Sequence, residues 1–214
     1  MAKVYIAGPI PQVGLDILEK NNIEVDMYDG PGVVDQETLK NGVKDADALI
    51  SILSTNVDKD VIAAGENLKV IANYGAGFNN VDIEYAESKG IYVTNTPGVS
   101  TRSTAELTFA LVLAVARRIA EGDQLSRTKG FDGWAPLFFR GREVSGKTIG
   151  IFGLGNIGYA VAKRAKAFDM DILYTGPHRK EDKEKELGAK YVDFDTLLKE
   201  SDFITINAAY KPEL

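Results

Sequence analysis

One glycine-rich stretch limits what this chain can fold into more than any other part of its sequence. An apolar run over residues 148–152 leads into Gly153, Gly155 and Gly158, which have the spacing Gly-x-Gly-x-x-Gly. Between a strand and a helix, such glycines allow a tight turn, let a diphosphate approach the backbone, and let helix and strand pack closely. The first turn of the helix then offers unpaired N–H groups and the positive end of its dipole. The stretch therefore predicts a dinucleotide site, with a purely structural glycine turn as the alternative.

The residues after these glycines complete a strand, helix and strand unit. Apolar side chains at helical spacing over residues 157–168 predict an amphipathic helix that packs on a sheet, and residues 171–174 return to a strand pattern. A lone glycine triplet is weak evidence for a nucleotide site. In this order of elements it is strong evidence, because nucleotide-binding turns have this context.

The first part of the chain alternates between strand and helix patterns. Five apolar, β-prone runs lie at residues 4–7, 23–28, 48–53, 68–73 and 91–95, with helical patterns between them. Asp35 has the position of an N-cap for one of these helices, which continues to about residue 43. This rhythm is typical of a parallel sheet that is covered by helices on both faces.

Two loops follow strands of this predicted sheet, at residues 54–56 and 75–80. In open parallel sheets, ligands bind beyond the carboxyl ends of the strands. The small residues Gly75, Ala76 and Gly77 can expose backbone N–H groups that hold a carboxylate without a cation. The alternative is that Gly75 and Gly77 only accommodate unusual backbone angles.

The pattern changes after residue 98. Residues 107–120 are nearly all apolar at helical spacing, and a helix that is apolar around most of its circumference must be buried on several sides. Residues 131–139 carry five large apolar side chains without a clear period, which is more typical of an interface than of a ligand pocket. We expect a homodimer that forms through the helix and arm of residues 100–140, with packing inside one chain as the alternative for the arm.

The last part of the chain holds only two further strand patterns, at residues 191–192 and 203–207, separated from the others by a mixed-charge run at residues 180–186. We interpret that run as a solvated helical face. A doubly wound domain has six strands in the order 3-2-1-4-5-6, so the four found here predict an incomplete one. In that order, residues 203–207 lie beside the first strand and leave a bare edge.

Composition excludes several classes of function. The 214 residues include no cysteine, so disulfides, thiolate catalysis and thiolate metal sites are excluded. A formal charge of −6, with no basic cluster beyond Arg179 and Lys180, argues against nucleic-acid binding. No apolar run reaches spanning length, and the N-terminus lacks the regions of a signal peptide. We expect a cytoplasmic protein with a small-molecule ligand, no metal and no membrane segment.

Three motifs, in this order, resemble those of the D-isomer-specific 2-hydroxyacid dehydrogenases. They are residues 73–82, residues 96–100 with 104–107, and residues 145–148 leading into the glycine turn. The family includes D-lactate dehydrogenases, glyoxylate and hydroxypyruvate reductases, and phosphoglycerate dehydrogenases. The resemblance implies an α/β fold, with a flavodoxin-like substrate domain over residues 1–99 and an incomplete doubly wound Rossmann dinucleotide-binding domain over residues 100–214. The implied reaction is hydride transfer between NAD(P)H and a small 2-oxo acid, which gives a D-2-hydroxy acid.

The resemblance also implies roles for single residues. The backbone amides of Ala76 and Gly77 match the loop that holds the substrate carboxylate, and the neighbouring wall of the pocket matches Leu53, Ser54 and Thr55. Thr104 matches a position that contacts the cofactor near the nicotinamide and phosphates, and a helix cap is its alternative role. The pyrophosphate turn matches Gly153, Leu154, Gly155, Asn156, Ile157 and Gly158.

The chain departs from the NAD-binding pattern at the end of the strand that follows the turn. Where an acidic residue would bind the ribose hydroxyls of NAD, the chain has Gly176, Pro177, His178 and Arg179. No acid repels a 2′-phosphate there, and Arg179 with His178 or Lys180 can pair with one. We predict that NADP(H) is accepted, and preferred over NAD(H), with ordinary solvated charges as the alternative.

A second departure concerns catalysis. Family members use an Arg that grips the substrate, and a His supported by Glu or Asp that donates the proton, and no residue of this chain matches them. The only histidine, His178, belongs to the adenosine end of the site. We therefore expect a chain that is truncated at its C-terminus, or whose gene stops early, and that is inactive or nearly so. The alternatives are a non-catalytic dinucleotide-binding or regulatory module and a purely structural fragment.

Overall fold

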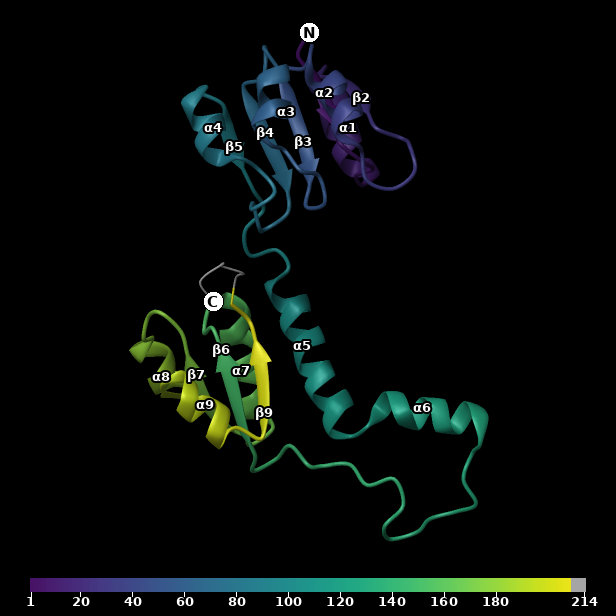
Figure 1. Ribbon diagram of the computed structural model, residues 1–214, viewed down its shortest axis with the longest axis vertical. Helices are drawn as coiled ribbons and strands as arrows, with labels where there is room; N and C mark the ends of the chain where they lie inside the picture. The colour runs from purple at the N-terminus through teal and green to yellow at the C-terminus, as the bar shows by residue number, and fades with distance from the viewer. Residues whose placement is uncertain (209–214) are drawn as a thin grey trace. The chain divides into compact units, whose positions relative to one another are not determined.

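The computed structural model describes residues 1–208, and the chain divides into two compact units, Met1–Val99 and a second that begins at Ser100 (Figure 1). Both units are α/β and both are built on parallel sheets. None of the helices within the described residues is both long and apolar enough to cross a membrane.

The first unit contains a five-stranded parallel sheet in the order β2-β1-β3-β4-β5, which is the flavodoxin-like order. All five predicted strands are present. The strands are β1 (Lys3–Ile6), β2 (Glu24–Met27), β3 (Ala48–Ile52), β4 (Val70–Tyr74) and β5 (Tyr92–Thr94). The helices are α1 (Gln12–Lys20), α2 (Gln36–Val43), α3 (Lys59–Ala64) and α4 (Ile83–Ser88).

The core of this unit lies between the sheet and helices α2 to α4. Leu49 and Ile71 of the sheet and Leu39 and Val43 of α2 are completely buried there. The predicted cap of α2 is confirmed, because the Asp35 carboxylate accepts hydrogen bonds from the N–H groups of the helix's first turn.

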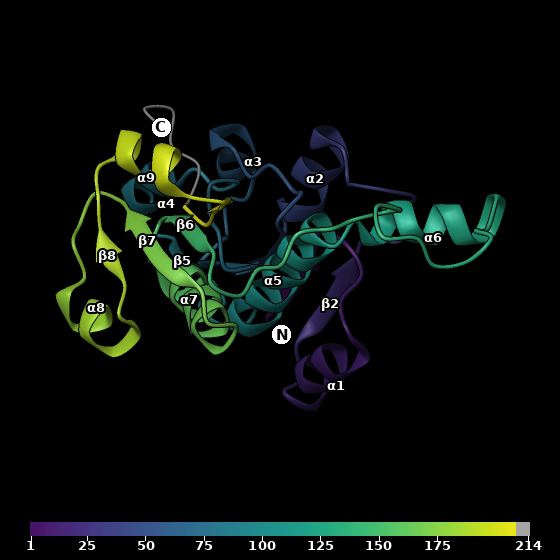
Figure 2. The same cartoon turned by 90° about the horizontal axis from the view of Figure 1, so that it is seen from below.

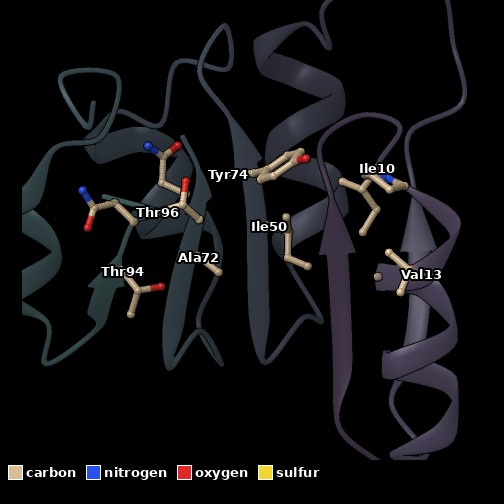
Figure 3. A pocket seen from close by; sticks show the side chains of 11 residues that line it. Ile10, Val13, Ile50, Ala72, Tyr74, Thr94 and Thr96 are labelled. Carbon is tan, nitrogen blue, oxygen red and sulfur yellow. The ribbon is translucent and has the colours of Figure 1, made fainter. Parts of the chain in front are cut away.

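Helices lie on both faces of this sheet, as predicted, but they cover the two faces unequally. Helices α2, α3 and α4 share one face, while α1 lies on the other face and packs mainly against the edge strand β2 (Figure 2). The uncovered part of that face is a hollow of about 310 Å³. Figure 3 shows Ile50, Ala72 and Thr94, one from each of β3, β4 and β5, beside Ile10 and Val13 in its lining.

The second unit contains a four-stranded parallel sheet in the order β8-β7-β6-β9. In chain order this is 3-2-1-4, so the predicted place of residues 203–207 beside the first strand is confirmed. Within the described residues, β9 pairs with β6 alone. The strands are β6 (Thr148–Phe152), β7 (Asp171–Thr175), β8 (Lys190–Tyr191) and β9 (Phe203–Ile206). The helices are α5 (Thr101–Ala116), α6 (Ile119–Thr128), α7 (Asn156–Ala167), α8 (Glu181–Leu187) and α9 (Phe194–Glu200).

Helix α5 is buried on one side only within its unit, where it packs on α7. Phe109 and Val112 are buried in that contact, but Leu107, Leu111 and Val115 are 62%, 57% and 73% exposed. The expectation of burial on several sides is therefore not met inside the unit. The segment of residues 131–139 is also largely exposed, with Trp134 at 87%.

Candidate functional site

The three glycines of the β6–α7 turn meet three different surroundings. Gly153 has a φ of +96°, a left-handed conformation that favours glycine, and an added Cβ would lie 2.9 Å from the backbone nitrogen of Ala208. A Cβ on Gly158 would lie 2.1 Å from the carbonyl oxygen of Gly153. A Cβ on Gly155 would have no atom within 4 Å. The first and third glycines are therefore required by the fold, whereas the second leaves open space above the turn.

The N-terminus of α7 opens onto this space. Gly155 is the N-cap of the 12-residue helix, and no side chain caps the N–H groups of the first turn. Asn156 and Ile157 begin the helix, so their N–H groups have no partner within it. Leu154 is only 4% exposed and belongs to the core, so it can serve a ligand only through its backbone. The arrangement suits a phosphate group.

A lysine from α8 lies beside the turn. Lys183 Nζ is 3.5 Å from the carbonyl oxygen of Leu154 and 4.7 Å from the ring centre of Tyr159. Burial lowers the pKa of Lys183, and the nearby charge of Lys180 lowers it further. The prediction of a solvated face for residues 180–186 is therefore wrong for Lys183 and Glu184, which are half-buried.

The loop after β7 adjoins the same turn. A Cβ on Gly176 would lie 3.9 Å from the Cα of Gly153, so the predicted phosphate turn and the predicted adenosine loop are neighbours. Pro177, His178 and Arg179 follow in the loop and are exposed.

Arg179 is paired with Glu184 of α8, and Glu184 also accepts a hydrogen bond from Tyr174 of β7. The hydrogen bond from Arg179 is the largest cause that lowers the pKa of Glu184, and the bond from Tyr174 is the next. Together they lower this pKa to about 2. Burial and the bond to Glu184 raise the pKa of Tyr174 to about 12. The carboxylate is therefore ionised and the phenol neutral over the whole physiological range.

Thr104 is the fourth residue of α5, and its backbone N–H donates to the carbonyl oxygen of Ser100, the N-cap. The alternative role of Thr104 as the helix cap is therefore wrong. Its contact with a cofactor stays a prediction.

The carbonyl groups of the loop after β4 are hydrogen-bonded within the first unit. Three consecutive carbonyl oxygens accept hydrogen bonds from within the unit: Gly75 from the Thr96 N–H (2.9 Å), Ala76 from Asn95 Nδ2 (2.8 Å) and Gly77 from Asn73 Nδ2 (2.7 Å). The N–H groups of Ala76 and Gly77 donate no hydrogen bond to any described residue, and both residues are exposed. Two adjacent backbone donors are thus available to an anion.

Asparagines fix this loop to the sheet. Asn73 is 2% exposed, and its Oδ1 accepts bonds from Ser51 Oγ (2.9 Å) and Asn80 Nδ2 (3.1 Å). Asn80 Nδ2 also donates to the carbonyl oxygen of Thr55 at 2.9 Å. The sequence interpretation missed these asparagines, although Asn73 lies near the end of β4, Asn95 directly follows β5, and Asn80 lies in the loop after β4. Their positions in the sequence could have identified them, because they are polar amides beside a glycine loop at the carboxyl edge of a sheet.

The glycines of this loop do not have unusual backbone angles. Neither Gly75 nor Gly77 has a positive φ, so that alternative is wrong. A Cβ on Gly75 would lie 2.2 Å from Leu53 Cδ2, so Gly75 permits close packing of the neighbouring loop. Of the predicted wall, Leu53 and Ser54 are exposed but Thr55 is completely buried.

The chain resembles known proteins along nearly its whole length. A family model described as D-isomer specific 2-hydroxyacid dehydrogenase, catalytic domain, matches residues 4–210. A Staphylococcus saprophyticus protein assigned as a 2-hydroxyacid dehydrogenase is 76% identical over 214 residues, which are 100% of this chain and 67% of that protein. The chain thus spans about two thirds of the length of this relative.

Solved structures agree with this similarity. A Thermus thermophilus protein matches with a TM-score of 0.92 and 37% identity, over 99% of this chain and 66% of its own. A D-lactate dehydrogenase from Aquifex aeolicus, complexed with NAD and lactic acid, matches with a TM-score of 0.82 and 28% identity, over 99% and 62%. An acyclic imino acid reductase in complex with NADPH and D-Arg matches with a TM-score of 0.84 and 27% identity, over 100% and 67%.

Proposed function

Because the chain belongs to the D-isomer-specific 2-hydroxyacid dehydrogenase family, we propose that it binds NAD(P)H and a small 2-oxo acid for hydride transfer between them. The hydride would pass from the dihydronicotinamide to the carbonyl carbon of the acid. The carbonyl oxygen would gain a proton, so that the products are a D-2-hydroxy acid and NAD(P)⁺.

The loop after β4 carries this proposal on the substrate side. Every 2-oxo acid presents a carboxylate, and the N–H groups of the exposed residues Ala76 and Gly77 are two adjacent donors with no internal acceptor among the described residues. Hydrogen bonds from neutral donors to a charged acceptor contribute about 1.5–3 kcal/mol each. Because the carbonyls of Ala76 and Gly77 are held by the side chains of Asn95 and Asn73, little reorganisation is needed on binding.

The β6–α7 turn supports the cofactor side. Its open Gly155 and the unpaired N–H groups of α7 suit the diphosphate of a dinucleotide. Similar proteins have been solved with NAD and with NADPH, which supports a nicotinamide cofactor of either kind.

We propose that the reaction's proton donor is absent from these 214 residues. The one histidine, His178, lies in the loop after β7, which is the loop expected to bind the adenosine half of the cofactor. A non-catalytic dinucleotide-binding module is therefore the second candidate function for the chain. Both candidates require the same cofactor site.

One pair of measurements tests the proposal on the 214-residue chain. Reduced nicotinamide fluorescence should change saturably when the chain is titrated with NADPH or NADH, and oxidation of the cofactor with glyoxylate, pyruvate or hydroxypyruvate should stay near background. A folded chain that leaves the fluorescence unchanged would defeat the cofactor assignment. Clear turnover would establish the enzyme and overturn our statement on the proton donor.

We also propose that the chain forms a homodimer through the helix and arm of residues 100–140. The support is an exposed apolar stripe on α5, formed by Leu107, Leu111 and Val115, and the exposed Trp134 of the arm. Apolar surface of this kind is stabilised by being removed from water at an interface.

A further inference from the structure

The two N–H groups of the proposed carboxylate site belong to two anchored peptide groups. A trans peptide group is planar, so the carbonyl of one residue and the N–H of the next point in opposite directions. The Gly75 carbonyl accepts from the Thr96 N–H at 2.9 Å and shares its peptide group with the Ala76 N–H. The Ala76 carbonyl accepts from Asn95 Nδ2 at 2.8 Å and shares its peptide group with the Gly77 N–H. Each anchor therefore sets the direction in which one N–H can donate.

These two peptide groups differ in their freedom to turn over. Type I and type II turns differ by such a rotation, which takes the φ of the residue after the peptide group to a positive value. A positive φ is unfavourable for alanine and costs glycine little. The peptide group before Ala76 is therefore restrained by the backbone itself. The one before Gly77, whose φ is not positive in the structure, can turn over unless another group holds it.

The side chain of Asn95 holds that second peptide group. Asn95 directly follows β5 and is half-buried. Within the described residues, its Nδ2 is the one donor to the Ala76 carbonyl. A hydrogen bond to the carbonyl also polarises the peptide group and makes its N–H a stronger donor. One side-chain amide thus both orients and strengthens the Gly77 N–H.

Asn73 anchors the next peptide group and has a different role. Its Nδ2 donates to the Gly77 carbonyl at 2.7 Å, and that peptide group carries the Phe78 N–H, which lies outside the proposed pair. Asn73 is also buried and bonded to Ser51 and Asn80, so it fixes the loop to the sheet. Of these two asparagines, only the one after β5 acts on a donor of the proposed pair.

We infer that Asn95 is a positioning residue for the substrate, because it keeps the Gly77 N–H directed at the carboxylate of the 2-oxo acid. The inference rests on the proposed function, since it takes the loop after β4 as the carboxylate site. Without the Asn95 amide, the peptide group between Ala76 and Gly77 could turn over and present its carbonyl oxygen, which repels a carboxylate. The loop would then bind the ligand through one N–H instead of two.

The test follows the amide signals of the ¹⁵N-labelled 214-residue chain during titration with oxamate, an analogue of a 2-oxo acid. Asn95→Ala should weaken oxamate binding about tenfold, as expected for the loss of one hydrogen bond to a charged group. It should also move the ¹⁵N signal of Gly77 before any ligand is added, and move that of Ala76 less. The matched control is Asn21→Ala at the end of α1, because Asn21 Nδ2 also donates to a backbone carbonyl, that of Ile17 at 2.7 Å. This control should change neither the affinity nor these signals.

A second substitution separates positioning from a general loss of structure. Alanine at position 77 disfavours the turned-over peptide group, and its Cβ has room, with Asn79 Oδ1 the nearest atom at 3.5 Å. In the Gly77→Ala background, Asn95→Ala should therefore weaken oxamate binding by less than about threefold. An equal loss in both backgrounds would overturn the inference.

The wild-type titration distinguishes failure of the inference from failure of the proposed function. If the wild-type chain binds oxamate and a folded Asn95→Ala chain binds it equally well, only this inference fails. If the folded wild-type chain binds no oxamate, the proposed carboxylate loop fails, and the inference fails with it.

Discussion

Alanine at Gly155 and alanine at Gly158 should have opposite effects, although each substitution adds the same methyl group to the same turn. At Gly158 the new Cβ would lie 2.1 Å from the Gly153 carbonyl oxygen. Because the contact is with backbone, the helix must move by about 1 Å, and such overpacking costs about 3 kcal/mol at the upper end of its usual range. Alanine's better helix propensity offsets about 1 kcal/mol of this. We expect a net loss of about 2 kcal/mol and a melting temperature lower by roughly 5–10 °C.

At Gly155 the new Cβ meets no protein atom within 4 Å, and a φ of −75° suits alanine. The stability cost should be only about 0.5 kcal/mol, because alanine is a slightly poorer N-cap than glycine. The methyl group would instead occupy the space that a diphosphate needs to reach the N–H groups of Asn156 and Ile157. Losing one or two such bonds corresponds to about 10-fold to 100-fold weaker binding of the dinucleotide.

Thermal unfolding by circular dichroism and calorimetric titration with NADPH distinguish these outcomes. Gly155→Ala should melt like the wild type but bind weakly, and Gly158→Ala should melt early. Unchanged NADPH affinity in a folded Gly155→Ala variant would refute the assignment of this turn to the diphosphate.

Three further predictions concern other parts of the chain. Gly77→Pro removes a backbone donor and should weaken the binding of oxamate, an analogue of a 2-oxo acid, at least tenfold by calorimetry. Gly77→Ala, whose Cβ has room, should bind oxamate normally. Equal affinities of the two variants would exclude this loop as the carboxylate site. The folded-state pKa of Glu184, about 2, lies below its usual value of 4.5, so its contribution to stability is present above pH 4.5 and is lost as the pH falls toward 2. Urea midpoints of the wild type and Glu184→Gln should therefore converge over that range, and a constant difference would contradict the pairing. Val115→Lys should turn a dimer into a monomer in sedimentation velocity, and a dimer that persists would place the interface elsewhere.

The sequence predicted the strands of both sheets because buried parallel strands are apolar runs separated by helical patterns. Thr148–Phe152 and Phe203–Ile206 are examples, and the order of a doubly wound sheet then placed the second beside the first. The cap at Asp35 was predictable because an N-cap depends only on residues two and three positions away. Signals that are local in the chain were therefore reliable.

Side-chain contacts between elements were not predictable. In the sequence, Glu184 belongs to a charged run that predicts a solvated face. In the structure its side chain is largely buried, because α8 packs where Tyr174 of β7 donates a hydrogen bond to its carboxylate. Asn73 was missed for the same reason, since its partners Ser51 and Asn80 come from different segments. The open face of the first sheet was missed because Ile50 and Ala72 are apolar whether or not a helix covers them.

The most direct test of the account maps both proposed sites in one experiment, by amide chemical shifts of the ¹⁵N-labelled 214-residue chain. NADPH should shift the amide signals of Gly155, Asn156 and Ile157, and oxamate should shift those of Ala76 and Gly77. If saturating ligands left these five signals in place while the chain was folded, neither loop would bind what we propose, and the account would be contradicted.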